Sequence, residues 1–207
     1  MAYPDSPTTT AERRQRVLDA VRALMAEQGF RVSMEAVAQR AGCSKQTLYA
    51  QFGSKNALLQ DLMHEHLEIT TARLDAFDGQ VRAPLLAFAI EHLERISAPD
   101  VVASCRLFSA ESPQFPEEAR SIWRDGGETL LSRLASWLSL AMEAGCLRHD
   151  QPHVAAEMLL SMMVGLDLER QRFAVPQRTS DQRRAWAELA VDTFLRAYAP
   201  TARAAHC

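Results

Sequence analysis

The chain has 207 residues, 47% of them hydrophobic and 24% charged, with a formal net charge of −3, and this is enough chain for two hydrophobic cores. No apolar run is as long as a membrane span, and residues 1–14 lack the basic-then-apolar order of a signal peptide, so we expect a cytoplasmic protein without membrane contact. The four cysteines, at positions 43, 105, 146 and 207, include no C-x-x-C pair and no histidine at zinc-ligand spacing, so we expect reduced thiols and neither a metal nor a cofactor.

The first predicted element is an amphipathic helix that follows a short tail. Residues 1–9 are rich in Pro, Thr and Ser, and we expect them to be disordered. Thr10 is then expected to cap a helix that ends at Gly29. Its apolar positions follow the i, i+3, i+4, i+7 spacing of a helix with one buried face, and they are Val17, Leu18, Val21, Leu24 and Met25.

The next segment, Ser33 to Leu58, is divided into three short helices by its capping residues. Ser33, Ser44 and Ser54 each stand immediately before a helical run, where a Ser hydroxyl accepts a hydrogen bond from an unpaired backbone N–H. Gly42, between the first two runs, can take the left-handed conformation that ends a helix. The spacing therefore predicts two helices that meet across a tight turn.

These two helices have the pattern of a helix-turn-helix. Their apolar residues are spaced so that both helices bury one face against a shared core, which leaves Lys45, Gln46, Thr47 and Tyr49 outside. The second helix of such a motif enters the major groove of DNA by its N-terminal end, so we predict that residues 45–52 form a recognition helix. The apolar positions are Val37, Ala38, Ala41, Leu48 and Phe52.

The remainder of the chain predicts further helices and shows no β alternation. Helices are expected at about 55–77, 81–97, 99–110, 115–144, 152–173 and 180–198, separated by Gly or Pro. The predicted fold class is therefore all-α, with about nine helices. We expect an N-terminal helix-turn-helix domain over residues 10–54, a helical bundle over 55–200 and a C-terminal tail over 201–207.

The helix-turn-helix segment resembles the N-terminal pattern of TetR-family transcriptional regulators. Departures from that pattern are mild: Ser33 replaces the more usual Thr, Cys43 replaces Val, Gln46 replaces a small residue and Gln51 replaces His. None of them removes a cap or a core side chain. The matching residues are Phe30, Ser33-Met34, Val37-Ala38, Ala41-Gly42, Ser44, Thr47-Leu48-Tyr49, Phe52 and Ser54-Lys55.

The resemblance implies a DNA operator as partner and assigns base contacts to the second helix. We expect Lys45, Gln46 and Thr47 to face base edges, because Lys suits guanine acceptors, Gln suits adenine and the Thr methyl suits thymine. A plain helix-start role for Thr47 is the alternative. Gln46 and Gln51 leave the operator sequence open.

The same resemblance assigns phosphate contacts. Tyr49 is the aromatic residue that contacts a phosphate in the family, although a core ring with an exposed hydroxyl is the alternative. Ser33, Ser44 and Lys55 stand at helix starts, where free backbone N–H groups favour an anion. We therefore expect these residues to hold the DNA backbone.

The charge distribution supports a DNA partner. Residues 1–60 hold eight Lys or Arg against five acids, whereas the remainder holds fifteen against twenty-one. A basic end on an acidic bundle orients the molecule toward phosphate. Solvated Arg-rich surfaces would look the same, so the charge supports the motif and does not replace it.

The C-terminal part, from Arg106 to Tyr198, resembles AcrR/AefR-like members of the family, which implies dimerisation through the last two helices. Small residues there would let helices approach closely, and aromatic residues would supply buried area for an isologous homodimer. A purely intramolecular core is the alternative. The candidate interface residues are Ala155, Leu159, Met162, Leu166, Trp186, Leu189, Ala190, Thr193, Phe194 and Ala197.

The resemblance also implies a small apolar or amphipathic effector, held in the bundle, whose binding releases DNA. His92 stands on or beside an apolar face, where an imidazole needs a partner, and a satisfied core His is its alternative. Cys105 would be a thiol sensor only if its pKa were lowered. The candidate pocket residues are Met63, His66, Phe88, His92, Cys105, Phe108, Trp123, Leu130, Leu134, Met158 and Met162, each of which can also be plain core.

We thus expect a DNA-binding transcriptional regulator, a repressor released by its effector. A helix-turn-helix protein without an effector, tuned by a protein partner, is the alternative. An all-helical enzyme is disfavoured because the sequence has no Gly-rich phosphate loop, no H-E-x-x-H and no nucleophile motif.

Overall fold

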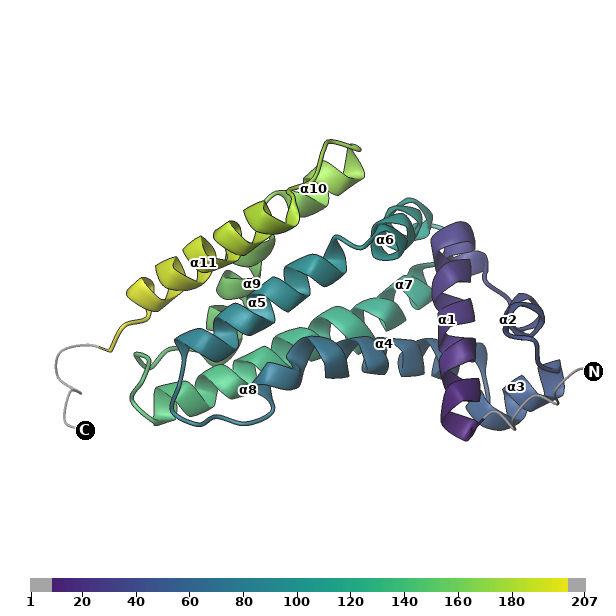
Figure 1. Ribbon diagram of the computed structural model, residues 1–207, viewed down its shortest axis with the longest axis horizontal. Coiled ribbons are helices and arrows are strands. Elements are labelled where there is room, and N and C mark those ends of the chain that lie inside the picture. The colour runs from purple at the N-terminus through teal and green to yellow at the C-terminus, as the bar shows by residue number, and fades with distance from the viewer. Residues whose placement is uncertain (1–8, 201–207) are drawn as a thin grey trace, which may run out of the picture.

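The structure, a computed structural model, describes residues 9–200 and is helical with no strand in that range (Figure 1). It confirms the predicted all-α class, with eleven α-helices among residues 9–200 where about nine were predicted. The tails predicted at 1–9 and 201–207 lie outside this range, except for residue 9. The N-terminal helices are α1 (Thr10–Gln28), α2 (Met34–Ala41) and α3 (Lys45–Phe52). They are followed by α4 (Lys55–Thr71), α5 (Arg82–Ile96), α6 (Pro99–Glu111), α7 (Pro116–Ile122), α8 (Thr129–Glu143), α9 (Pro152–Val164), α10 (Asp167–Arg172) and α11 (Ser180–Ala197).

A first hydrophobic core, the N-terminal core, holds α1, α2 and α3 together. Leu18 and Val21 of α1, Val37 of α2, Leu48 of α3 and Leu58 of α4 are all buried in it. Full burial of such a side chain stabilises the fold by about 1.5–3 kcal/mol. The apolar face of α3 is thereby fixed, and its other face is left outside.

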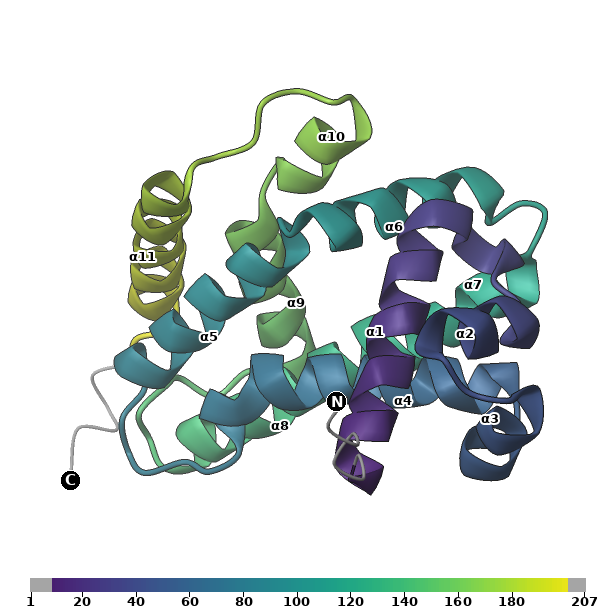
Figure 2. The same cartoon turned by 45° about the vertical axis from the view of Figure 1, so that its right-hand side comes forward.

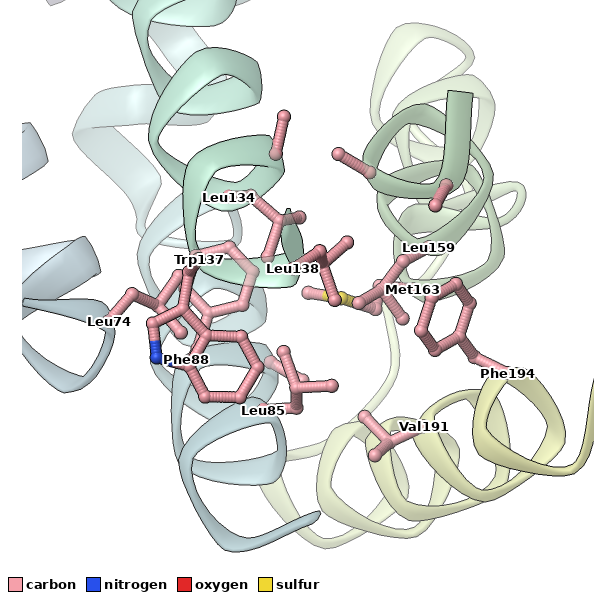
Figure 3. Close-up of a cluster of buried hydrophobic side chains, with 14 of the residues drawn as sticks. Leu74, Leu85, Phe88, Leu134, Trp137, Leu138, Leu159, Met163, Val191 and Phe194 are labelled. Atoms are coloured by element: carbon pink, nitrogen blue, oxygen red, sulfur yellow. The ribbon is translucent and has the colours of Figure 1, made fainter. Parts of the chain in front are cut away.

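A second cluster, the C-terminal core, lies between α5, α8, α9 and α11 (Figure 3). Phe88 of α5, Leu134 and Trp137 of α8, Leu159 of α9 and Phe194 of α11 are fully or almost fully buried in it. From Phe88 to Phe194 these side chains span more than a hundred residues of the chain, so this core forms only when the whole bundle is assembled.

α4 belongs to both cores and joins the two parts of the molecule. Leu58 and Leu62 in its first half are buried in the N-terminal core, whereas Leu67 in its second half is buried in the C-terminal core. α6 provides a second connection, because it packs against α1 (Figure 2). The N-terminal helices are thus attached to the bundle at two places.

The start of α1 differs from the prediction by one residue. Thr9, and not Thr10, is its N-cap: the Thr9 hydroxyl accepts the Glu12 N–H at 3.2 Å, and the Glu12 carboxylate accepts the Thr9 N–H at 2.8 Å. This reciprocal pair is a capping box, which requires a Glu or Gln three residues after the cap. Glu12 therefore selects Thr9 among neighbouring threonines.

Three of the long helices predicted after residue 54 are interrupted. The helix predicted over 152–173 is two helices, because Gly165 takes a φ of +53° and ends α9. The helix predicted over 115–144 contains a π-helical segment, Trp123–Glu128, between α7 and α8. The helix predicted over 55–77 ends at Thr71 and continues only as a 3₁₀ turn to Leu74.

Among residues 9–200, no helix combines the length and the apolar character needed to cross a bilayer.

Candidate DNA interface

The turn between α2 and α3 is built by the residues that the sequence indicated. The Ser33 hydroxyl accepts the Ala36 N–H at 3.1 Å, and the Ser44 hydroxyl accepts the Thr47 N–H at 3.0 Å. Gly42 ends α2 in the left-handed conformation, with φ 68° and ψ 36°. The two capped helix starts and the left-handed Gly fix the angle at which α3 leaves the turn.

α3 buries one face and exposes the other. Leu48 and Phe52 are buried in the N-terminal core, while the candidate contact residues Lys45, Gln46, Thr47, Tyr49 and Gln51 are all exposed. The exposed side chains therefore include amine, amide and hydroxyl groups, which are the groups that read base edges and phosphates.

Two of these side chains already have partners within the protein. The Lys45 ammonium lies 3.5 Å from the Glu35 carboxylate, and both side chains are exposed. The Ser44 and Thr47 hydroxyls lie 2.7 Å apart. An exposed ion pair of this kind is worth at most about 1 kcal/mol, so a phosphate or a base can replace Glu35 as the partner of Lys45.

Lys55 is less exposed than expected for a side chain whose role is to contact a DNA phosphate. Its Nζ donates to the Phe30 carbonyl oxygen at 2.6 Å, and the residue is only partly exposed. Burial lowers the pKa of Lys55, and the nearby Glu118 opposes this effect. An ammonium carries three donors, so two remain for other acceptors. Lys55 consequently ties the start of α4 to the 3₁₀ turn Gly29–Arg31, the segment that follows α1.

Glu111, which the sequence analysis did not single out, holds the same segment from the other side. The Phe30 N–H donates to its Oε2 at 2.9 Å, and Arg31 Nη1 lies 2.6 Å from its Oε1. The Phe30 ring packs against Phe108, with centroids 4.6 Å apart. Phe30 and Glu111 are 81 residues apart in the chain, and no spacing pattern in the sequence connects them.

Family comparisons match both halves of this architecture. A model described as "Bacterial regulatory proteins, tetR family" matches residues 17–62, which contain α2, α3 and the turn between them. A model described as "AefR-like transcriptional repressor, C-terminal domain" matches residues 83–200, more than half of the chain. The chain belongs to the TetR family. It is accordingly a DNA-binding transcriptional regulator and not an enzyme.

Individual relatives agree with this assignment. The TetR-family chain is 32% identical to the structure of "Flavonoid-responsive Regulator FrrA", with a TM-score of 0.69, and the match covers 93% of this chain and 100% of FrrA. A TetR-family regulator from Mesorhizobium loti superposes with a TM-score of 0.72 at 23% identity, covering 93% and 99% of the two chains. The uncharacterised regulator YvkB of Bacillus subtilis is 21% identical over 158 residues, which is 75% of this chain and 82% of YvkB.

The candidate effector residues of this TetR-family chain do not gather around one cavity. Phe88, His92, Leu130 and Leu134 are buried in or against the C-terminal core, and Phe108 packs on Phe30. Cys105, Trp123 and Met158 are exposed, while Met162 packs partly buried against the C-terminal core. His66 accepts a hydrogen bond from Arg95, and Met63 lines a small hollow beside α7. Helical spacing alone had thus assigned buried residues and surface residues to the same candidate pocket.

The candidate dimer residues separate into two groups. Ala155, Leu159, Ala190 and Phe194 are buried within the protomer, because α5 and α8 cover the inner faces of α9 and α11, so the structure does not place them at an interface. Leu166 and Leu189 are 66% and 55% exposed, and Ala197 is also exposed. Met162, Trp186 and Thr193 are partly exposed. Leu166, after the end of α9, and Leu189, on α11, are thus apolar side chains that the other residues of the range 9–200 leave exposed.

Proposed function

We propose that the protein is a transcriptional repressor that binds a pseudo-palindromic operator as a homodimer and is released by a small apolar or amphipathic effector in the cytoplasm. The observation that carries the DNA part is α3, whose exposed face presents Lys45, Gln46 and Thr47 from a capped and rigidly packed start. Recognition helices of this kind read the major groove by their N-terminal residues.

Within this proposal, the contacts fall into two types. Lys45, Gln46 and Thr47 read bases, with Gln51 further along α3 at the edge of the interface. Ser33, Ser44, Tyr49 and Lys55 position the phosphate backbone. For Lys55 this means that its ammonium keeps the Phe30 carbonyl as one partner and offers its remaining donors to phosphate.

The dimer is supported by the outer faces of α9 and α11. Leu189 of α11 is exposed, and Met162 of α9 and Trp186 and Thr193 of α11 are partly exposed. Leu166, which follows the end of α9, is 66% exposed. Exposed apolar side chains on neighbouring helices are typical of a subunit interface. In a twofold dimer the two α3 helices would enter successive major grooves about 34 Å apart.

The effector response is supported by the relationship to FrrA, which is named as flavonoid-responsive and is 32% identical over its full length. A flavonoid is a flat, largely apolar molecule with polar hydroxyls, and it falls within the effector class that the resemblance implied. A hollow of about 580 Å³ lies along α5 and the turn after α4, in the size range of small-molecule sites.

Selection of bound sequences from random DNA tests this proposal, combined with the mass of the protein in solution. A repeat with twofold symmetry, bound by a dimer, is the expected result. If about 8 phosphates are neutralised, log K should fall with log salt at a slope near −7. A slope near zero would refute specific DNA binding.

Two substitutions separate the contact types. Gln46→Ala should change the selected sequence, whereas Lys55→Ala should weaken all sequences alike by about tenfold. A thermal-shift screen for stabilising compounds decides between a small-molecule effector and a protein partner, because a ligand that binds only the folded state raises the melting temperature.

A further inference from the structure

A cluster of charged side chains lies where the two parts of the molecule meet. Arg22 of α1 pairs with Glu65 of α4 at 2.7 Å. Arg95 of α5 donates from Nε to His66 Nδ1 at 3.1 Å. Asp100 of α6 stands between the two guanidinium groups, 4.0 Å from Arg22 Nε and 3.6 Å from Arg95 Nη1. We call these five residues the junction cluster.

The junction cluster leaves one buried guanidinium N–H without an acceptor. Both distances to Asp100 are too long for hydrogen bonds, so Asp100 bonds neither Arg22 Nε nor Arg95 Nη1. The other two nitrogens of Arg22 are bonded, Nη1 to Asp19 and Nη2 to Glu65, each at 2.7 Å. Arg22 Nε is buried and has no hydrogen-bond partner. A buried N–H without an acceptor costs about 1–3 kcal/mol, which is unusual in a native protein and points to a missing acceptor.

The histidines of this region add donors and not positive charge. Burial, with Arg95 and Arg22 nearby, lowers the pKa of His66 to about 4, against the smaller opposing effect of Asp100. His66 is therefore neutral near pH 7, and since its Nδ1 accepts from Arg95, its proton is on Nε2. His92, stacked on Phe88, is buried with Nδ1 unpartnered. An oxygen that accepts hydrogen bonds would suit this set of groups.

Arg95 also forms part of the wall of the 580 Å³ hollow, so it connects the junction cluster with a space that a ligand can enter. Ala87 and Ile90 supply apolar surface in the same hollow. Of its two acids, Glu94 is already bound to Arg183 at 2.6 Å and to the Ser180 hydroxyl at 2.6 Å. Glu91 is then the one acid left in this lining against Arg73 and Arg95, so the remaining charge of the lining favours an anion.

We propose that the effector is an organic acid with a flat apolar frame, and that Arg95 recognises its acidic oxygen, a carboxylate or an ionised phenol. This inference rests on the proposed effector response. The acidic oxygen replaces Asp100 as the partner of Arg95, because a charge-assisted hydrogen bond is stronger than an ion pair at 3.6 Å. Asp100 is then free to move toward Arg22, so binding of the acid at Arg95 changes the contacts of α1 through Asp100.

The test uses the full-length protein and two pairs of matched probes. 2-Naphthoate is compared with its methyl ester, and 4-nitrophenol, which ionises near neutral pH, with 4-nitroanisole, by thermal shift and by calorimetry. The acid of each pair should raise the melting temperature, and the capped form should not. Equal shifts within both pairs, or failure of both acids to bind up to their solubility, would overturn the proposal.

Variants assign the effect to Arg95. Arg95→Gln should weaken binding of the acids by about tenfold or more, whereas Arg120→Gln, on the exposed surface of α7, should change nothing. Asp100→Asn should strengthen binding, because it removes the competing carboxylate. A folding defect would weaken binding in both Arg95→Gln and Asp100→Asn, so the opposite signs distinguish recognition from damage. Acid binding that is unchanged in Arg95→Gln would refute the assignment.

Operator DNA separates this inference from the proposed function. If neutral compounds release the operator from the wild type and from Arg95→Gln alike, the effector response stands and the acid class is wrong. If 2-naphthoate binds in an Arg95-dependent manner and no compound alters operator affinity, the acid site stands and the effector response is wrong.

Discussion

The N-terminal helices and the C-terminal bundle are held together over different distances in the chain. Ser33, Ser44 and Ser54 each accept the N–H of the residue three positions later. In the bundle, Arg82 of α5 pairs with Asp192 of α11 at 2.7 Å across 110 residues. The DNA-binding part is therefore shaped by local chemistry and the bundle by assembly of the whole. Single substitutions in the N-terminal helices should therefore affect DNA binding first, whereas single substitutions in the bundle should affect stability first.

The largest expected effect tests the bundle. Trp137→Ala should lower the free energy of unfolding by about 3–5 kcal/mol, because it empties a packed site in the C-terminal core and removes the hydrogen bond from the indole to the Ala76 carbonyl. Trp123→Ala, at a site 65% exposed, should change it by about 0.5 kcal/mol or less. Chemical denaturation measures both. Comparable losses would mean that burial does not govern stability here.

The second effect is a pH dependence of the free energy of unfolding, and it comes from His66 of α4 and His92 of α5. Burial lowers the pKa of both His66 and His92 to about 4, while each titrates near 6.5 in the unfolded chain. The unfolded state therefore binds more protons between these values, so stability is complete above about pH 6.5 and decreases toward pH 4. The loss is on the order of 3 kcal/mol per histidine.

Unfolding midpoints measured from pH 7 to 4 test this expectation. The double variant His66→Gln and His92→Gln should flatten the curve, whereas His153→Gln, at an exposed position of α9, should leave its slope unchanged. A curve of the same steepness in the double variant would assign the pH dependence to other groups.

Glu111→Ala should have an intermediate effect on the link between the parts. It leaves the Phe30 N–H without an acceptor and should cost about 1–3 kcal/mol, with faster hydrogen exchange at that amide. Glu111→Gln keeps an acceptor oxygen for the Phe30 N–H and should lose less stability. Glu117→Ala, on the surface of α7, is the control. Unchanged exchange at Phe30 in Glu111→Ala would show that the bundle does not hold this segment.

The smallest effect tests the local chemistry of α3. Ser44→Ala removes the cap and should cost about 1 kcal/mol of stability, while operator affinity falls because the first turn of the helix frays. Ser44→Asn should recover most of both losses, since Asn also caps. Ser109→Ala, which is exposed on α6, is the control. A stability loss without any loss of operator affinity would place the start of α3 outside the interface.

The same distinction explains what the sequence could predict. The caps and the left-handed Gly42 depend on neighbours within four residues, so the boundaries of α2 and α3 were predictable. The bond from Lys55 to Phe30 and the bond from Phe30 to Glu111 depend on how helices meet, which periodicity does not encode. For the same reason, helical spacing did not distinguish Phe194, buried within the protomer, from Leu189, which is exposed.

The rarity of lysine gives the molecule a chemical handle. Lys45 and Lys55 carry the only side-chain amines among 207 residues. The Lys45 side chain is 54% exposed at the start of α3, whereas Lys55 is partly buried and bonded to a carbonyl. Of the two lysines, an amine-reactive fluorophore should therefore label Lys45 first, at the position where DNA would approach. Ordinary acylation chemistry could thus report on operator binding without any engineered cysteine.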